Sequence, residues 1–205
     1  GSVLNSTSYV NPGENYSQFV SGKLTAYMLV NSAFDLQNVR NNPGGTYALG
    51  RDIKNVNNSI ANFSPIPNFT GLFDGQNLTV SNVTIDAPSD SKNVGLFDTI
   101  GRTGIVRNLN LTDVTVNGLN SQFVGTLAGT NAGTVSNVSI TGTMLVDSGS
   151  TWGVHVGQNL GTISNSSAAV SVTVIPSPGG NPSGGTTPNQ PSPGDTTSST
   201  ASAGN

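Results

Sequence analysis

The stretch that decides the fold is VGTLAGTNAGTVSN at residues 124–137, which returns as WGVHVGQNLGTISN at residues 152–165. Two earlier stretches, beginning at Thr70 and Val94, fit the same pattern, and each of the four leads to an apolar residue, a polar residue and an asparagine. These asparagines stand 26, 29 and 28 residues apart, at Asn82, Asn108, Asn137 and Asn165. Such a regular interval predicts a protein built from stacked, equivalent units.

One repeat unit has the pattern of short strands. In residues 109–116, LNLTDVTV, apolar residues alternate with polar ones, slip by one position at Thr112-Asp113, and alternate again. This pattern indicates two strands joined by a bend, and residues 68–175 show no helical periodicity. Two or three short strands per unit, with Gly and Asn at the corners, predict an all-β chain folded as a parallel β-helix, or β-solenoid. Equivalent aliphatic side chains would then stack about 4.8 Å apart.

The recurring asparagines suit the corners of such coils. Asparagine tolerates a positive φ, and its side-chain amide is able to bond the equivalent amide of the next coil. We therefore expect a structural ladder along one corner, formed by Asn82, Asn108, Asn137 and Asn165. The alternative is that these are four independent turn asparagines.

Composition divides the chain into three regions. Residues 176–205 hold six of the eleven prolines and a single charged residue, so they are expected to form a linker or a disordered tail. The last coil would then be either covered by this tail or cut from a longer array. The expected regions are an N-terminal cap at residues 1–45, coils at residues 46–175 and the tail at residues 176–205.

The expected cap contains a short helix. In the stretch 31–40, Ser32 is a candidate N-cap and Asp35 follows three residues later, while Pro43 and two glycines end the pattern. Because the end of a solenoid exposes unpaired strand edges and apolar side chains, a cap at this place would protect the first coil.

Composition also excludes several classes of function. Only 8% of the 205 residues are charged and the net charge is −3, with seven Lys and Arg, so a nucleic-acid partner is not expected. No apolar run reaches the roughly 20 residues of a membrane-spanning helix, so membrane insertion is not expected either. The chain has one histidine and no cysteine, which excludes His-rich zinc sites and Cys-metal sites. We expect no cofactor, no metal and no catalytic residue, with His155 at a coil surface or edge.

Carbohydrate cleavage is the enzymatic alternative, because pectate-lyase-like β-helices gather carboxylates on one face of the solenoid. The candidate carboxylates are Asp52, Asp74, Asp86, Asp98 and Asp113. Asp74 and Asp98 both follow the phenylalanine of the aligned pattern, so neighbouring coils would bring them within the ~5–9.5 Å that a glycosidase needs. Alternatively, Asp74 belongs to a tight Asp-Gly turn and Asp98 caps the next bend.

Two further features concern sugars. Ten Asn-x-Ser/Thr sequons occur, a modest excess over chance, and Asn57 and Asn62 are the best candidates for glycosylation because they are expected in exposed loops. Four aromatic residues fall in the cap region and would either form a sugar platform or, as we favour, pack against the first coil: Tyr9, Tyr16, Phe19 and Tyr27.

The stretches at 124–137 and 156–166 resemble the GLUG repeats of large bacterial surface proteins. The stretches YALGRDI at 47–53 and FTGLFDG at 69–75 are similar to segments that precede such repeats in filamentous-haemagglutinin-like adhesins of the two-partner secretion type. The last unit departs from the pattern, because Gly153-Val154-His155-Val156 replaces a glycine-leucine-valine core, which suggests a distorted coil.

This resemblance implies a right-handed, secreted β-helix that belongs to a longer adhesin chain at the bacterial cell surface. The expected function is a non-catalytic structural or adhesive segment, and the expected partner is a receptor on a host cell or a sibling bacterium, including a glycan. The alternatives are a carbohydrate-acting β-helix enzyme and a cap that directs folding or secretion without binding of its own.

Overall fold

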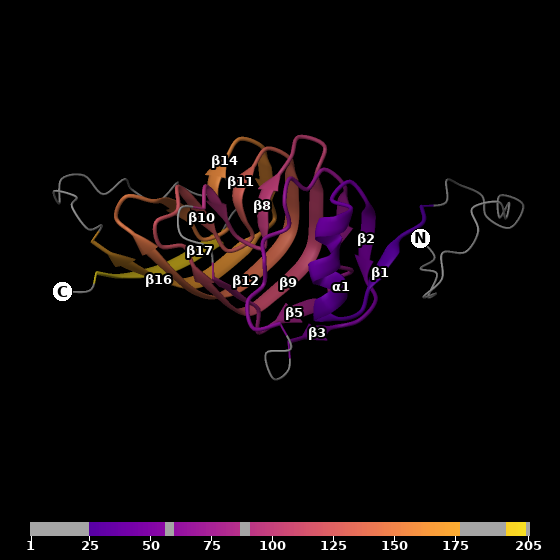
Figure 1. Cartoon of the computed structure of the whole chain (residues 1–205), viewed down its shortest axis with the longest axis horizontal. Coiled ribbons are helices and arrows are strands. Elements are labelled where there is room, and N and C mark those ends of the chain that lie inside the picture. Colours follow the sequence, from indigo (N-terminus) through magenta and orange to yellow (C-terminus); the bar gives the residue numbers. More distant parts are fainter. Residues whose placement is uncertain (1–24, 56–59, 87–90, 177–195, 204–205) are drawn as a thin grey trace, which may run out of the picture.

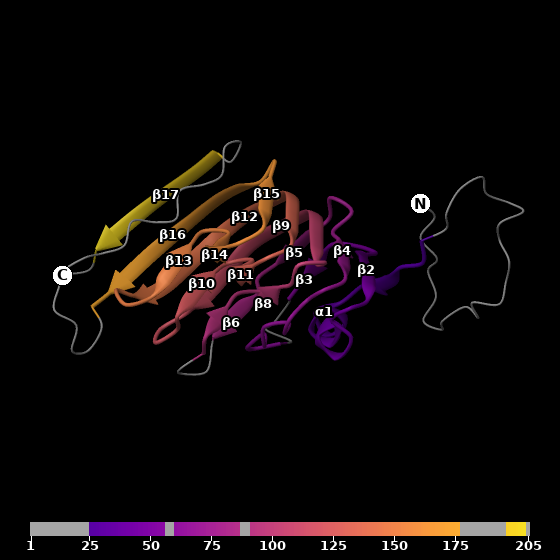
Figure 2. The same cartoon turned by 90° about the horizontal axis from the view of Figure 1, so that it is seen from above.

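The computed structural model describes residues 25–55, 60–86, 91–176 and 196–203. They form a parallel β-solenoid of about four turns with one short helix near the N-terminal end. Figure 1 shows the coils stacked along the long axis of the molecule, and Figure 2 shows the same stack from above, with α1 and β17 at opposite ends. The predicted all-β, parallel β-helix architecture with a helix-containing N-terminal end is confirmed.

Three parallel sheets line the solenoid. The largest has the order β1 (Met28–Val30), β2 (Thr46–Leu49), β4 (Leu72–Asp74), β9 (Ile105–Asn117), β12 (Thr134–Asp147), β16 (Ser167–Ile175) and β17 (Thr196–Ala203). Shorter strands pair alongside this path: β3 (Ile53–Lys54), β5 (Thr79–Ser81), β6 (Thr84–Asp86) and β15 (Thr162–Ser164). The second sheet is formed by β7 (Asn93–Val94), β10 (Phe123–Gly125) and β13 (Thr151–Gly153). The third is formed by β8 (Phe97–Ile100), β11 (Ala128–Asn131) and β14 (Val156–Asn159).

The core consists of equivalent apolar side chains stacked between coils. One such column pairs Tyr47 with Phe73, Phe73 with Val106, Val106 with Val135 and Val135 with Ile163. Aromatic rings fill the first coils, with the ring centroid of Phe97 lying 5.0 Å from that of Phe69 and 6.1 Å from that of Phe73. All three rings are fully buried, and Phe69 and Phe73 both pack against Phe97 in the core.

The bend predicted at Thr112-Asp113 is a break in strand register. Leu111 pairs with Ile140 and Val114 pairs with Gly142, so β9 has one more residue than β12 between these pairs. Asp113 adopts a φ of 53°, which turns the chain at this point. Alternation resumes on the far side with Val114 and Val116 buried, as the sequence pattern predicts.

The N-terminal end is covered by α1 (Ala33–Asn38) and a 3₁₀ turn, η2 (Val39–Asn41). Ser32 Oγ accepts a hydrogen bond from the Asp35 N–H at 3.1 Å, and Asp35 Oδ2 accepts one from the Asn31 N–H at 3.1 Å. These reciprocal bonds confirm the predicted N-cap, although the helix is shorter than the stretch 31–40. Leu36 is buried against the first coil, whereas Phe34 is 59% exposed on the outer side.

Parts of the predicted cap and of the predicted tail lie outside the described residues. Tyr9, Tyr16 and Phe19 lie outside the described residues, as does most of the predicted tail. Within that tail, β17 pairs in parallel with β16 from Ser167 opposite Thr196. These two residues are 29 positions apart in the sequence, and β17 covers the edge of β16, which agrees with the alternative that the tail covers the last coil.

Candidate functional site

Three of the four predicted ladder asparagines stand at one bend in successive coils. Ser136 pairs with Arg107 on one side and with Ser164 on the other, which places Asn108, Asn137 and Asn165 next to one another. Their φ angles are 53°, 55° and 49°, in the left-handed region that asparagine tolerates. The Asn137 Nδ2 donates a hydrogen bond to Asn108 Oδ1 at 2.9 Å, the amide-to-amide contact that the ladder requires.

The prediction for Asn82 is wrong. Ser81 pairs with Thr112, so Asn82 stands beside Asp113 at the next bend. Asn77 takes its place: its N–H donates to the Asn108 carbonyl oxygen at 2.8 Å, and its Oδ1 accepts from Asn137 Nδ2 at 3.1 Å. A sequence signal for this existed, because NLTV at 77–80 matches NLNL at 108–111 and NVSI at 137–140.

The bend that carries Asn108 is closed by an ion pair in which Asp74 is buried and Arg107 is half-buried. Asp74, 3% exposed, accepts a bond from Arg107 Nε at 2.8 Å, one from Asn108 Nδ2 at 3.1 Å and one from the Gln76 N–H at 3.0 Å. Arg107 Nη2 also bonds the Tyr27 hydroxyl at 3.4 Å, which links the N-terminal segment to β9. The bonds from Arg107 and Asn108 join Asp74 to the neighbouring coil, so the cluster has a structural role.

The environment of Asp74 lowers its pKa. Burial by itself raises the pKa of this carboxyl, but the hydrogen bonds from Gln76, Asn108 and Arg107, together with the positive charge of Arg107, outweigh burial. Its pKa therefore lies below the ordinary value. The same pairing raises the pKa of Arg107 against the opposite effect of its own burial.

We expect acid to destabilise the solenoid partly through Asp74. A carboxyl with a lowered folded-state pKa contributes stability that is present above its unfolded pKa of about 3.9 and is lost as the pH falls through the folded value. The free energy of unfolding should therefore fall between about pH 5 and pH 3, and fall less in Asp74→Asn. At neutral pH this variant should lose about 1–3 kcal/mol, because the partners of the carboxylate remain partly unsatisfied.

Urea denaturation at a series of pH values measures this effect. Asp113→Asn is the matched control, because it removes the same charge at an exposed bend whose positive φ asparagine also adopts. If the free energy of unfolding depends on pH in the same way in the wild type and in Asp74→Asn, the role assigned to Asp74 is wrong.

The other candidate carboxylates do not converge on one face. Asp74 lies on β4 in the largest sheet and Asp98 on β8 in the third sheet, so the expectation that they are neighbours is wrong. Asp98 Oδ1 accepts a bond from the Asn68 N–H at 2.9 Å, and Asp52 Oδ1 accepts one from the Thr79 N–H at 2.8 Å. Asp98 and Asp52 therefore each accept a backbone N–H from another segment of the chain, and the Asp98 bond agrees with the alternative that this residue caps a bend. No group of three metal-binding side chains occurs among the described residues.

The structure also tests the positions expected for His155 and for the glycosylation candidate Asn62. His155 is 4% exposed, so the prediction of a surface or edge position is wrong, and its carbonyl oxygen accepts the N–H groups of Leu127 and Ala128. Asn57 lies outside the described residues. Asn62 is exposed, but its side-chain amide bonds the Asp86 N–H at 2.7 Å and the Asp86 carbonyl oxygen at 2.8 Å. A glycan at Asn62 would compete with the second of these bonds.

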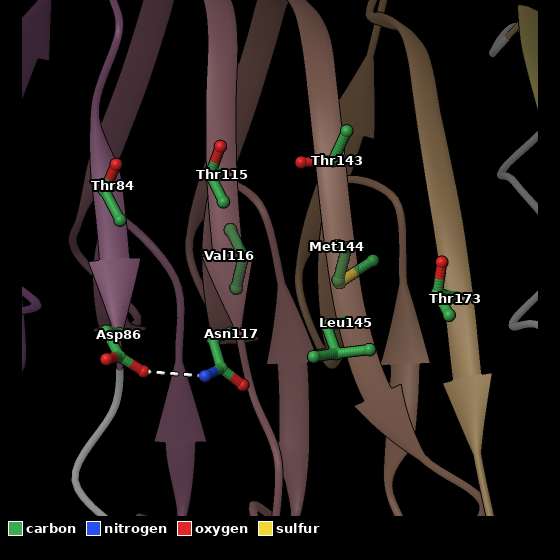
Figure 3. Close-up of a pocket in the computed structure, with 9 residues that line it drawn as sticks. All are labelled: Thr84, Asp86, Thr115, Val116, Asn117, Thr143, Met144, Leu145 and Thr173. Carbon is green, nitrogen blue, oxygen red and sulfur yellow. Dashed lines mark hydrogen bonds between the residues drawn. The ribbon is translucent and has the colours of Figure 1, made fainter.

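One groove lies on the outer face of the largest sheet, over β6, β9, β12 and β16. Its volume is about 450 Å³, and Figure 3 shows the side chains around it. The lining residues are Thr84, Asp86, Thr115, Val116, Asn117, Thr143, Met144, Leu145 and Thr173. No sequence motif marks these positions, and among them only Asp86 was a candidate from the sequence. The groove has hydroxyl, amide, carboxylate and methyl groups, which suit reversible binding.

The fold and these contacts define a segment of a parallel β-solenoid with a polar outer face. The chain belongs to the family described as the M26 IgA1-specific metallo-endopeptidase N-terminal region, whose model matches residues 11–142. The finer assignment, a GLUG-repeat segment of a filamentous-haemagglutinin-like adhesin, stays a prediction. The zinc-binding motif H-E-x-x-H needs two histidines, and the chain has one.

The relatives are parts of larger proteins. The chain is 38% identical over 156 residues to halomucin of Haloquadratum walsbyi, covering 69% of this chain and 2% of halomucin. It is 35% identical over 123 residues to a protein of Evansella cellulosilytica provisionally named as a Gly-rich membrane protein, covering 55% of this chain and 14% of that protein. The chain therefore spans a small part of each curated relative.

A solved structure supports the fold. A crystal structure from Bacteroides ovatus, provisionally assigned as an immunoglobulin A1 protease, superposes with a TM-score of 0.50 at 15% identity, covering 72% of this chain and 64% of that one. Together, these similarities indicate a segment of a surface or secreted protein. None of the helices in the described residues has the length and apolar character needed to cross a membrane.

Proposed function

We propose that this chain is a non-catalytic, adhesive segment of a longer protein that acts outside the cell, at the bacterial surface. The observation that carries the proposal is the outer face of the largest sheet, where small polar side chains recur at the coil spacing. Outward positions on β12 pair with outward positions on β9 and β16, as in the row Thr115, Thr143 and Ser171. Such a surface offers many weak, equivalent contacts to a partner.

The carboxylates are occupied by structural hydrogen bonds and an ion pair, which supports a binding role over a catalytic one. Asp74 is held by Arg107 and Asn108, and Asp98 and Asp52 each accept a backbone N–H. A glycosidase needs a facing pair of carboxyl groups, one of them protonated to act as the acid. The lowered pKa of Asp74 is unsuited to that acid role.

Attachment and turnover are tested side by side. The fluorescently labelled chain is incubated with epithelial cells and with bacteria, binding is followed by flow cytometry, and reducing ends are measured after incubation with acidic and neutral polysaccharides. We expect saturable binding without release of sugars. The double variant Asp74→Asn and Asp98→Asn, checked for folding by circular dichroism, should bind as the wild type does. Release of oligosaccharides that disappears in the double variant would replace this proposal with the carbohydrate-acting enzyme.

A further inference from the structure

Two rows of outward-facing side chains cross the groove of Figure 3. The register of β6, β9 and β12 aligns Thr84, Thr115 and Thr143 in the first row. Two residues further along the strands, the second row is Asp86, Asn117, Leu145 and Thr173. Both rows run along the solenoid axis, so their members recur at the strand spacing of about 4.8 Å.

The hydroxyl groups in the groove are available to a ligand. Among the described residues, none of the four threonine hydroxyls that line the groove bonds to a side chain or backbone group of the protein. Elsewhere on the solenoid, hydroxyl groups bond asparagine side chains of the neighbouring coil: Ser139 Oγ donates to Asn110 Oδ1 at 2.8 Å, and Thr130 Oγ1 donates to Asn93 Oδ1 at 2.9 Å. The groove therefore combines unused donors and acceptors with threonine methyl groups and the Leu145 side chain.

The charge in the groove selects against anions. Asp86 is the only charged lining residue, and one of its carboxylate oxygens accepts a bond from Asn117 Nδ2 at 2.8 Å, which fixes both side chains. Among the described residues, no group bonds the other carboxylate oxygen, which can accept a hydroxyl. No Lys or Arg lines the groove, so a phosphate, sulfate or uronate group would meet a negative charge without a cation to balance it.

We propose that the groove binds a neutral oligosaccharide chain, laid along the two rows. A neutral sugar offers hydroxyl groups that act as both donor and acceptor, matching threonine hydroxyls and the Asn117 amide, and C–H faces that contact Leu145 and the threonine methyls. This inference rests on the adhesive role proposed above and names its ligand.

An extended peptide is the weaker fit for this groove. Peptides that bind sheets gain affinity from main-chain hydrogen bonds to an unpaired strand edge. Beneath the groove, β9 is paired with β6 on one side and β12 on the other, and β12 is in turn paired with β16. The backbone groups of these strands are therefore already used, and only side chains remain to meet a ligand.

The absence of an aromatic side chain from the groove lining implies weak binding at a single site. A weak site still produces firm attachment when several copies engage one polysaccharide, because linked binding events raise the effective concentration. Binding by the isolated chain should therefore be measured by a method suited to millimolar affinity.

Two-dimensional amide NMR of the full chain tests the proposal, with mannohexaose, cellohexaose and isomaltohexaose as neutral probes. We expect at least one probe to shift the amide signals of Thr115, Asn117, Thr143 and Leu145. Replacing Thr115 and Thr143 together by valine keeps shape and strand propensity but removes two hydroxyls, and should weaken binding by about tenfold or more. The matched control replaces Thr134 and Thr162 by valine. Both residues are exposed on the same sheet outside the groove, so this variant should bind the probe as the wild type does.

Three results would overturn the inference: no shift with any neutral probe, shifts confined to other surfaces, or tighter binding of a heparin hexasaccharide or an extended Ser/Thr peptide. Attachment to cells tests the adhesive role separately. If cells bind the chain and the Thr115 and Thr143 double variant equally well, adhesion stands and this groove is not its site. If cells do not bind the chain but the neutral probe does, the groove stands and the adhesive role fails.

Discussion

Replacing Phe97 by alanine is expected to lower the free energy of unfolding by about 3–5 kcal/mol. Phe97 is fully buried at the start of β8, and its ring packs against Phe69 and Phe73. These three rings come from separate segments of the chain, so the loss of one ring leaves a cavity between sheets that the backbone closes only in part. The effect should therefore be among the largest of any single substitution.

Guanidinium denaturation of the wild type and of Phe97→Ala measures the difference. Phe34→Ala is the matched control, because it removes the same ring from a helix surface where Phe34 is 59% exposed, and it should change stability by at most about 0.5 kcal/mol. Phe97→Leu keeps most of the volume and should fall between the two. Similar losses at positions 97 and 34 would show that the aromatic cluster does not form as described.

The strands and their inward faces could be predicted from the sequence because their signal is local. Alternation in residues 109–116 and the slip at Asp113 follow directly from the period of two in a strand and its interruption at a bend. The helix cap at Ser32 is equally local, since its bonds to Asp35 span three residues. Such features need no knowledge of which coils are neighbours.

The alignment of the two units that begin at Thr70 and Val94 could not be predicted in the same way, because the register of a strand depends on the strand of the next coil. Gly71-Leu72-Phe73 and Gly95-Leu96-Phe97 have the same letters, yet Phe73 pairs with Val106 and Phe97 with Ala128. A solenoid demands only that inward positions be apolar, so a Leu-Phe pair fits several places in a coil. Aligning Phe73 with Phe97 therefore led to two wrong predictions: that Asn82 belongs to the ladder, and that Asp74 and Asp98 are neighbours.

The groove could not be found from the sequence, because its residues share no motif. Thr84, Thr115 and Thr143 come from three different repeats and are adjacent only through strand pairing. In a chain with 49 Ser and Thr residues, outward threonines carry no signal of their own. Only the register and the shape of the sheet show which of them line a groove.

Replacing Ile140 by alanine should cost about 2–5 kcal/mol, whereas Ser139→Ala should cost at most about 1.5 kcal/mol. Ile140 is 2% exposed on β12 and stacks between Leu111 and Ala168, so its loss leaves a cavity that the small Ala168 cannot fill. Ser139 is the neighbouring residue on the same strand and faces outward, where its hydroxyl makes one hydrogen bond to Asn110. Urea denaturation of the two variants therefore compares the two faces of one strand at adjacent positions. Equal losses at 139 and 140 would mean that the strand presents the opposite face to the core, because a shift of one residue exchanges every inward and outward side chain.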